Sequence, residues 1–197
     1  MHLQKKETDK ALEVFSKGVK QVNEKSDKNI VSDFYAILGD LYHTKKMQAE
    51  AYAAYDSSLV YNPDNIGSLN NYAYYLSLER KNLDKAEEMS YRTVKAEPEN
   101  ATYLDTYAWI LFEKGKYTEA RIYIDQAMRS EEGKKSPLIV EHCGDIYYML
   151  GEKEKALEYW KQSASMDDKE EDGSTPRTKE ELNRLKRKIA LKKYIAE

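Results

Sequence analysis

The residues best suited to chemistry lie together at His142, Cys143 and Asp145, with Glu141 directly before them. A histidine beside a cysteine suggests an activated thiolate nucleophile. The spacing argues against this interpretation, because neighbouring residues on a helix point about 100° apart and do not face each other. Cys143 also falls at a position of the repeat pattern described below that is expected to be buried. We therefore predict no catalytic residues, and a protein that is not an enzyme.

A metal site is the second chemistry that this cluster could support. Glu141 and Asp145 are spaced i, i+4, and His142 and Asp145 are spaced i, i+3, so two or three of these side chains could share one ion. No second cluster at ligand spacing accompanies them, and no glycine-rich phosphate loop is present. We predict no metal and no cofactor. A regulator of a hydrolase, with a metal at His142, is the alternative in this class.

The helices that carry these residues belong to a pattern that occurs four times. One small residue and one alanine mark each occurrence: Gly39, Ala73, Ala108 and Gly144, then Ala51, Ala86, Ala120 and Ala156. The first set is spaced by 34, 35 and 36 residues, and a fixed period of this size is the signature of a solenoid. Apolar residues at i, i+3, i+4 and i+7 indicate that each unit is a helix–turn–helix. The small residues are expected where two helices cross closely.

The repeated unit closely resembles the tetratricopeptide repeat. Its eight signature positions are filled in residues 32–65 by Tyr35, Leu38, Gly39, Tyr42, Ala51, Tyr55, Ser58 and Pro63. The resemblance covers four full units, about residues 32–168. It implies an all-α fold, a right-handed α–α superhelix with four helix–turn–helix repeats.

We predict that residues 1–197 form a single solenoid. The expected parts are a partial repeat (2–28), four repeats (32–65, 66–100, 101–136 and 137–168) and a C-terminal capping helix (178–196). In the partial repeat, Lys5–Asp9 is expected to be a turn before a lone second helix. Such a half repeat indicates either a fragment of a longer repeat protein or a chain whose first helix serves as a cap. Residues 23–30 are expected to be a linker, Gly133–Ser136 a turn, and Met166–Pro176 an acidic, solvated break. Thr178–Glu181 is expected to be a capping box, and Leu182, Leu185 and Ile189 to form a narrow apolar stripe on the last helix.

Composition excludes several classes of partner. The formal net charge is −3 and the pI is about 5.8, which predicts no nucleic-acid partner. No apolar run approaches the ~20 residues that span a bilayer, so we predict no direct membrane insertion. No signal peptide is recognisable either, and cytoplasmic and bacterial envelope or periplasmic locations both stay open. The basic run Arg184–Lys193 is interpreted as the solvated face of the capping helix.

The resemblance also implies where a partner binds. In the tetratricopeptide repeat family, ligand-facing side chains come mainly from positions 2, 5, 6, 9, 12 and 13 of each repeat, on its first helix. From these positions we predict the following partner-binding residues, called the groove residues below: Asp40, His43, Asn70, Asn71, Tyr74, Asp105, Trp109, Phe112, Glu141, His142, Asp145 and Tyr148. The full set of positions contains no lysine or arginine, which favours a basic or aromatic-rich peptide or protein partner.

One subclass of the family grips a peptide carboxylate with lysine, arginine and asparagine. The corresponding positions here are Ala36, Asp40, Asn71, Thr102 and Thr106. Only Asn71 agrees, so we predict that the chain is not a carboxylate clamp. The predicted function is a non-enzymatic scaffold that binds a partner in an acidic, aromatic-lined concave groove. The alternative is a structural or self-associating array, part of a longer repeat protein, without a peptide ligand.

Overall fold

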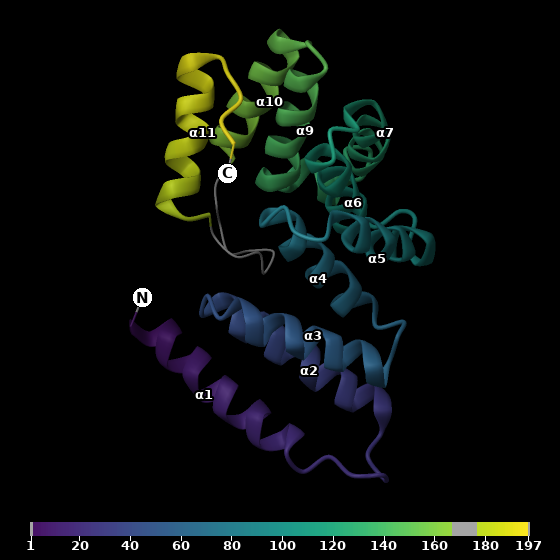
Figure 1. Cartoon of the computed structure of the whole chain (residues 1–197). Helices are drawn as coiled ribbons and strands as arrows, with labels where there is room; N and C mark the ends of the chain where they lie inside the picture. Colours follow the sequence, from purple (N-terminus) through teal and green to yellow (C-terminus); the bar gives the residue numbers. More distant parts are fainter. Residues whose placement is uncertain (1, 167–176, 197) are drawn as a thin grey trace. The chain divides into compact units, whose positions relative to one another are not determined.

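The computed structural model describes residues 2–166 and 177–196, which form helices joined by turns (Figure 1). The helices are α1 (His2–Val19), α2 (Lys28–Thr44), α3 (Gln48–Tyr61), α4 (Ile66–Leu78), α5 (Leu83–Ala96), α6 (Ala101–Glu113), α7 (Tyr117–Ala127), α8 (Glu131–Lys135), α9 (Pro137–Met149), α10 (Lys153–Ser165) and α11 (Lys179–Leu191). These residues contain no strand, which confirms the all-α fold class. The chain divides into two compact units, Met1–Tyr75 and Leu76–Glu197, which we call unit 1 and unit 2.

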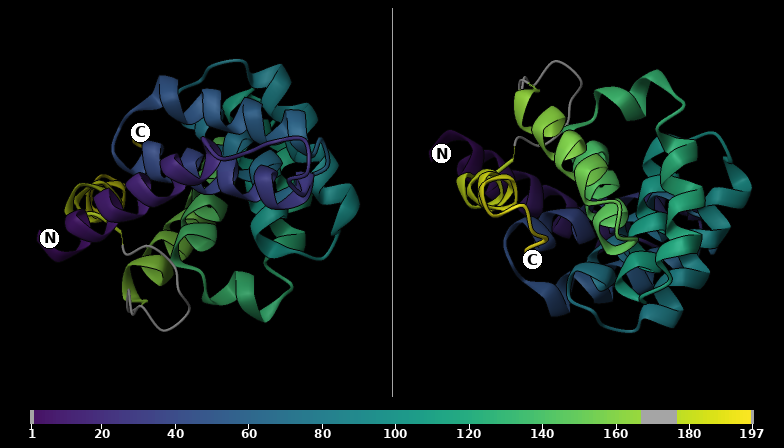
Figure 2. Two further views of the ribbon diagram at one scale, coloured as in Figure 1. Left: turned by 90° about the horizontal axis from the view of Figure 1, so that it is seen from below. Right: turned by 90° about the horizontal axis from the view of Figure 1, so that it is seen from above.

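In unit 1, α2 and α3 lie side by side and form one helix pair (Figures 1 and 2). Gly39 of α2 faces the ring of Tyr55 so closely that a Cβ atom at this position would lie 2.6 Å from a ring carbon. Ala51 and Tyr55 of α3 are fully buried. The close crossing explains why a small residue recurs here, since a side chain would push the two helices apart.

Unit 2 repeats this arrangement in the pairs α6–α7 and α9–α10. A Cβ atom on Gly144 of α9 would lie 2.5 Å from the indole ring of Trp160 on α10. Ala108 of α6 and Ala120 of α7 are fully buried, as is Ala156 of α10. The small positions identified from the period therefore mark helix crossings in both units, as predicted.

Several predicted boundaries are wrong. Lys5–Asp9 is not a turn, because α1 continues through it, and no glycine or proline interrupts that stretch. The predicted linker 23–30 ends early, because the Asp27 carboxylate caps α2 by accepting the backbone N–H groups of Asn29 and Ile30. The predicted turn Gly133–Ser136 overlaps the short helix α8.

Near the C-terminus, the predicted capping box at the start of α11 is confirmed. The Thr178 hydroxyl accepts the backbone N–H of Glu181, and the Glu181 carboxylate accepts the backbone N–H of Thr178. The helix ends at Leu191, because Lys192 adopts a left-handed conformation with φ of 49°. Residues 167–176 of the predicted acidic break lie outside the described residues. None of the described helices is long and apolar enough to cross a membrane.

We expect Gly144→Ala to destabilise unit 2, although alanine has the higher helix propensity. The added methyl group would overlap Trp160, and overpacking of this kind typically costs about 1–3 kcal/mol. Gly67→Ala is the matched control, because a Cβ atom added at Gly67 would lie 3.5 Å from its nearest neighbour, an ordinary contact. Urea unfolding of both variants measures the difference. If Gly144→Ala is as stable as Gly67→Ala, the crossing of α9 and α10 can accommodate a methyl group, and the prediction is wrong.

Candidate partner-binding groove

In unit 2, helices α6 and α9 carry the groove residues. Asp105, Trp109 and Phe112 lie on α6 at spacings of four and three, so they share one helix face. The members on α9 are Glu141, His142, Asp145 and Tyr148. Except for Tyr148, which is half-buried, these side chains are buried. The groove face of α6 and α9 is therefore covered in this structure.

Helix α11 supplies the cover at α9. It lies beside α10 in unit 2 (Figure 1). Its Lys188 side chain reaches the carboxylates of α9. The Lys188 Nζ atom is 2.8 Å from Glu141 Oε1, 2.9 Å from Asp145 Oδ1 and 2.7 Å from Asp145 Oδ2. Lys188 is only 1% exposed. We call this arrangement of Glu141, Asp145 and the Lys188 ammonium the lysine site.

Arg177, two residues before α11, adds a second cation to the same site. Its Nη1 atom is 3.2 Å from Glu141 Oε2 and 3.0 Å from the hydroxyl of Ser163, and its Nη2 atom donates to the Ser163 carbonyl. Glu141 therefore contacts one cation with each carboxylate oxygen. Charge-assisted hydrogen bonds of this kind are stronger than neutral ones, and here they are shielded from water.

Aromatic rings continue the covered surface along α6. The Trp109 ring stacks on His142 at 4.1 Å and on Phe112 at 4.7 Å between ring centroids. Phe112 in turn meets Tyr194, which follows α11, at 5.5 Å. His142 Nδ1 lies 2.9 Å from Asp105 Oδ1. The aromatic groove residues of unit 2 thus form a continuous stack that ends against the C-terminal segment.

Burial and pairing set the ionisation of the lysine site. Burial raises the pKa of Asp145 to about 6, because desolvation outweighs the attraction of Lys188 and the Glu141 carboxylate acts in the same direction as burial. Burial also acts to raise the pKa of Glu141, but the charge of Lys188 and its hydrogen bond prevail, so that this pKa is lowered. Glu141 therefore ionises more easily than an ordinary glutamate, and Asp145 less easily than an ordinary aspartate.

We expect Asp145 to make unit 2 less stable as the pH rises from about 5 to 7. Its folded-state pKa of about 6 lies above the ordinary value of 3.8, so its stabilising contribution is full below 3.8 and is lost as the pH rises through 6. Relative to Asp145→Asn, the free energy of unfolding of the wild type should fall by about 1 kcal/mol over this interval. Urea titrations at both pH values measure it, and an identical pH dependence of the two proteins would contradict it.

In unit 1 the groove residues are held by neighbours within the unit. Asp40 accepts hydrogen bonds from the Tyr55 hydroxyl and from Asn71 Nδ2, the latter at 3.0 Å. Asn70 donates to Asn71 at 3.2 Å. His43 stacks on Tyr75 with ring centroids 3.4 Å apart. Tyr74, which is half-buried, lies at an angle to Tyr75 with 5.9 Å between their centroids.

One arrangement recurs in both units and was not predicted. Trp160 Nε1 donates to Asp145 Oδ1 at 2.9 Å, in the same way that the Tyr55 hydroxyl donates to Asp40. In each pair an aromatic residue 15 positions later, on the second helix of the repeat, orients an acidic residue on the first helix. The shared spacing of 15 in the sequence is the signal that would have identified it.

The two other chemical roles considered for this region, a thiolate nucleophile and a metal site, are not supported by the geometry of the described residues. Cys143 is fully buried, and burial raises the pKa of its thiol to about 12, which opposes formation of a reactive thiolate. Within residues 2–166 and 177–196, no three His, Cys, Asp or Glu side chains are grouped as metal ligands would be. The carboxylates that could have shared a metal, Glu141 and Asp145, instead surround the ammonium of Lys188.

Sequence reasoning missed the residues that fill the groove. The basic run Arg184–Lys193 was expected to be wholly solvated, and this is wrong for Lys188, which is buried at the lysine site. The predicted apolar stripe of α11 carried part of the signal, because Lys188 follows Leu185 by three residues and so lies on the same helix face. A basic residue on that face matches a groove without lysine or arginine.

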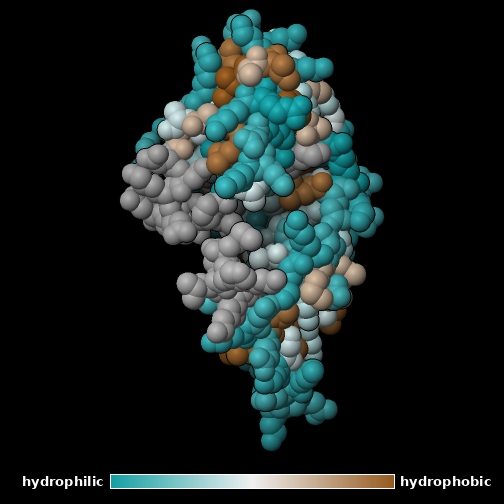
Figure 3. All heavy atoms as spheres, turned by 90° about the vertical axis from the view of Figure 1, so that its left-hand side faces the viewer, coloured by the Kyte–Doolittle hydropathy of each residue, from teal (hydrophilic) through white to brown (hydrophobic). Residues whose placement is uncertain are grey.

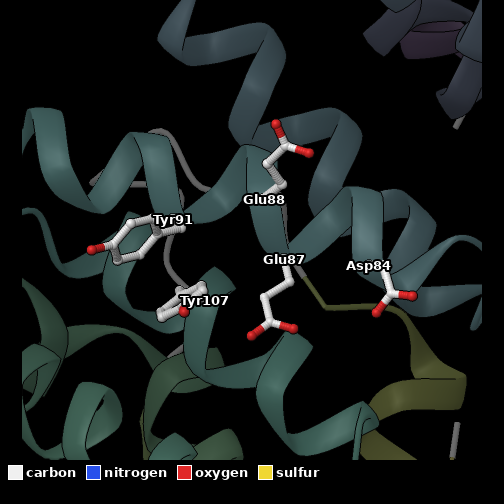
Figure 4. A pocket seen from close by; sticks show the side chains of 5 residues that line it. All are labelled: Asp84, Glu87, Glu88, Tyr91 and Tyr107. Atoms are coloured by element: carbon white, nitrogen blue, oxygen red, sulfur yellow. The ribbon is translucent and has the colours of Figure 1, made fainter.

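A second acidic hollow lies on α5 and α6 of unit 2 (Figure 4). It has a volume of about 320 Å³ and is lined by Asp84, Glu87, Glu88, Tyr91 and Tyr107. Its carboxylates are partly neutralised, since Glu87 contacts Lys114 and Lys116, and Asp84 contacts Lys114. A cationic side chain that binds Glu87 here would therefore compete with Lys114 and Lys116.

Comparisons with known proteins agree with the repeat pattern. A family model described as tetratricopeptide repeat matches residues 71–172, just over half of the chain. Among solved structures, a pilus biogenesis factor, PilW, is similar with a TM-score of 0.74 and 15% identity, covering 97% of this chain and 80% of its own. The thermophilic repeat protein TTC0263 of Thermus thermophilus has a TM-score of 0.66 and 15% identity, covering 94% and 90%.

A third similar structure is PilF of Pseudomonas aeruginosa, with a TM-score of 0.60 and 17% identity, covering 93% of this chain and 85% of its own. At these identities the likeness concerns the fold alone. No curated protein sequence matches the chain significantly.

Proposed function

The chain belongs to the tetratricopeptide repeat family, and on this basis we propose that it is a non-enzymatic scaffold whose groove residues bind a basic peptide or protein segment. Proteins of this family and fold commonly act by binding other proteins. The partner surface and the chemistry of the ligand are the specific parts of the proposal. They rest on the side chains of the groove, since a fold alone does not determine function.

One observation carries the proposal: the groove face of unit 2 already accommodates a basic helix. Glu141 and Asp145 contact the ammonium of Lys188, and Arg177 completes the pairing of Glu141. The stacked rings of Trp109 and Phe112, which continue to His142 of α9, supply flat apolar area of the kind that anchors binding partners. A cationic side chain flanked by an aromatic or aliphatic one matches both features.

The proposal is tested by titrating labelled helical peptides with the full-length protein and following fluorescence anisotropy. Peptides rich in lysine and aromatic residues should bind at least tenfold more tightly than peptides in which glutamate replaces lysine. Binding should weaken as the salt concentration rises, because exposed charges are screened. The double variant Glu141→Gln/Asp145→Asn should lose this preference, since amides retain the shape of the site without its charge.

Glu88→Gln is the control, because it removes one carboxylate from the other acidic hollow and leaves the groove residues intact. Circular dichroism checks that both variants are folded. If basic and acidic peptides bind alike, or if the double variant binds as the wild type does, the groove proposal is wrong. A general role as an interaction scaffold would then need another surface.

Self-association stays a prediction without a specific surface to support it. On the face drawn in Figure 3, hydrophilic residues predominate and the hydrophobic ones form small separate patches. The large exposed apolar residues of unit 1 include Val14, Ile30 and Val60, and scattered exposed apolar side chains are normal in soluble proteins. Light scattering at increasing protein concentration tests it, and a constant monomer mass would exclude a self-assembling array.

A further inference from the structure

Within unit 2, helix α11 buries only one lysine and one leucine against the other helices. Of its residues, only Leu185 and Lys188 are buried, each 1% exposed. Leu182 and Ile189 are half-buried, and Leu191 is 62% exposed. A helix that serves only as a cap would be expected to cover the last repeat with a broad apolar stripe. The contact made by α11 is narrow, and its centre is ionic.

An ionic centre makes the contact selective for a cation, but it adds little to the binding energy. Desolvating a lysine and two carboxylates offsets much of the attraction between them, so an apolar contact of equal size would hold the helix as well or better. The site does discriminate, because a helix without a cation at this point would leave Asp145 buried without a cationic partner and Glu141 with Arg177 alone. The ion pairs therefore contribute more to selectivity for a helix with a lysine than to the stability of the contact with α11.

Two features favour opening of the contact between α11 and the rest of unit 2. Elements with little buried apolar surface belong to the least stable part of a structure and open by local fluctuations. Six further basic residues of the α11 region, Arg184, Lys186, Arg187, Lys192, Lys193 and Lys179, are exposed or half-buried, so they remain hydrated when α11 leaves. Once exposed, the two carboxylates would regain water and remain available to another cation.

We infer that α11 is an internal ligand of the groove, and that the external partner is a basic amphipathic helix that places a lysine between Glu141 and Asp145 in place of Lys188. This inference rests on the proposed function and makes it more specific. The partner helix carries a leucine or aromatic residue three positions before the lysine, as Leu185 precedes Lys188, and it competes directly with α11. Because α11 is part of the same chain, it competes at an effective concentration on the order of millimolar for a short connection.

The test uses a labelled synthetic peptide of residues 177–196 as the probe and full-length proteins as receptors. Lys188→Ala in the protein weakens the internal competitor, so its affinity for the peptide should exceed that of the wild type at least tenfold. Lys186→Ala alters an exposed lysine of the same helix and should bind as the wild type does. A peptide that itself carries the Lys188→Ala change should bind the Lys188→Ala protein at least tenfold more weakly than the unchanged peptide.

Lys188→Met serves as a second receptor, because it retains much of the aliphatic chain if Lys188→Ala proves poorly folded by circular dichroism. Equal affinity of the peptide for wild type, Lys186→Ala and the Lys188 variants would overturn the inference while leaving the proposed function standing, since the groove would bind without internal competition. Failure of the peptide to bind any folded receptor would also overturn it. Failure of all basic peptides, including unrelated ones, would remove the proposed function as well.

Discussion

Lys188→Ala is expected to release α11 from unit 2 while the helices α6, α7, α9 and α10 stay folded. Amide hydrogen exchange of residues Lys179–Leu191 should rise towards the rate of an unstructured chain, whereas exchange in the four other helices should change little. The reason is that the substitution leaves buried Asp145 without a cation and Glu141 with Arg177 alone.

The magnitudes favour release over a strained closed state. Breaking a buried ion pair by removing one partner costs about 3–5 kcal/mol. Full burial of Leu185, the main apolar contact of α11, contributes only about 1.5–3 kcal/mol. Opening lets water reach the two carboxylates. The protein then loses the free energy of burying Leu185, which is smaller than the cost of keeping the carboxylates buried without Lys188. Protected α11 amides in Lys188→Ala would show that apolar contacts hold the helix, and Lys186→Ala should retain wild-type protection.

Trp160→Ala is expected to produce the largest loss of stability among single changes near the site. Trp160 is fully buried against Gly144, and removing a buried tryptophan side chain typically costs about 3–5 kcal/mol. The change also removes the Nε1 hydrogen bond that Trp160 donates to Asp145, so Asp145 is oriented less well and the affinity for basic peptides should fall. Chemical denaturation and peptide titration measure the two effects.

Trp160→Phe separates these contributions, because it retains a ring and removes the donor. We expect a loss of about 1.5–3 kcal/mol for this variant, as is typical of a hydrogen bond to a charged group, although Asp145 Oδ1 keeps its contact with Lys188. Tyr55→Phe in unit 1 is the equivalent change, since the Tyr55 hydroxyl donates to Asp40. If Trp160→Phe unfolds at the wild-type denaturant concentration, the hydrogen bond to Asp145 contributes nothing measurable.

The repeat period allowed much of the fold to be predicted, because burial of small residues at helix crossings leaves a direct trace in sequence. Gly39 and Gly144 were identified from spacing alone, and both lie against a large ring in the structure. Helix ends were less predictable. The start of α2 depends on a cap at Asp27, and α1 extends through residues that the repeat register had assigned to a turn.

The composition of the site was predictable, whereas its occupancy was not. The sequence indicated acidic and aromatic residues on the first helices of the repeats, and Glu141 and Asp145 do contact a cation in unit 2. That the cation comes from α11 depends on how the chain folds back onto α9, a long-range contact between residues 188 and 141 that no local pattern encodes. The stripe of α11 showed that one face is buried, but it did not show that a lysine belongs to that face.

The most direct test of exchange at the lysine site observes α11 while a competitor binds. The full-length wild-type protein is labelled with ¹⁵N, and the unlabelled peptide of residues 177–196 is added in excess. The amide signals of Lys179–Leu191 in the protein should shift towards those of a free helix or coil, and the peptide with Lys188→Ala should leave them unchanged. Signals that stay in place at saturating peptide, or that respond equally to both peptides, would contradict an exchangeable lysine site.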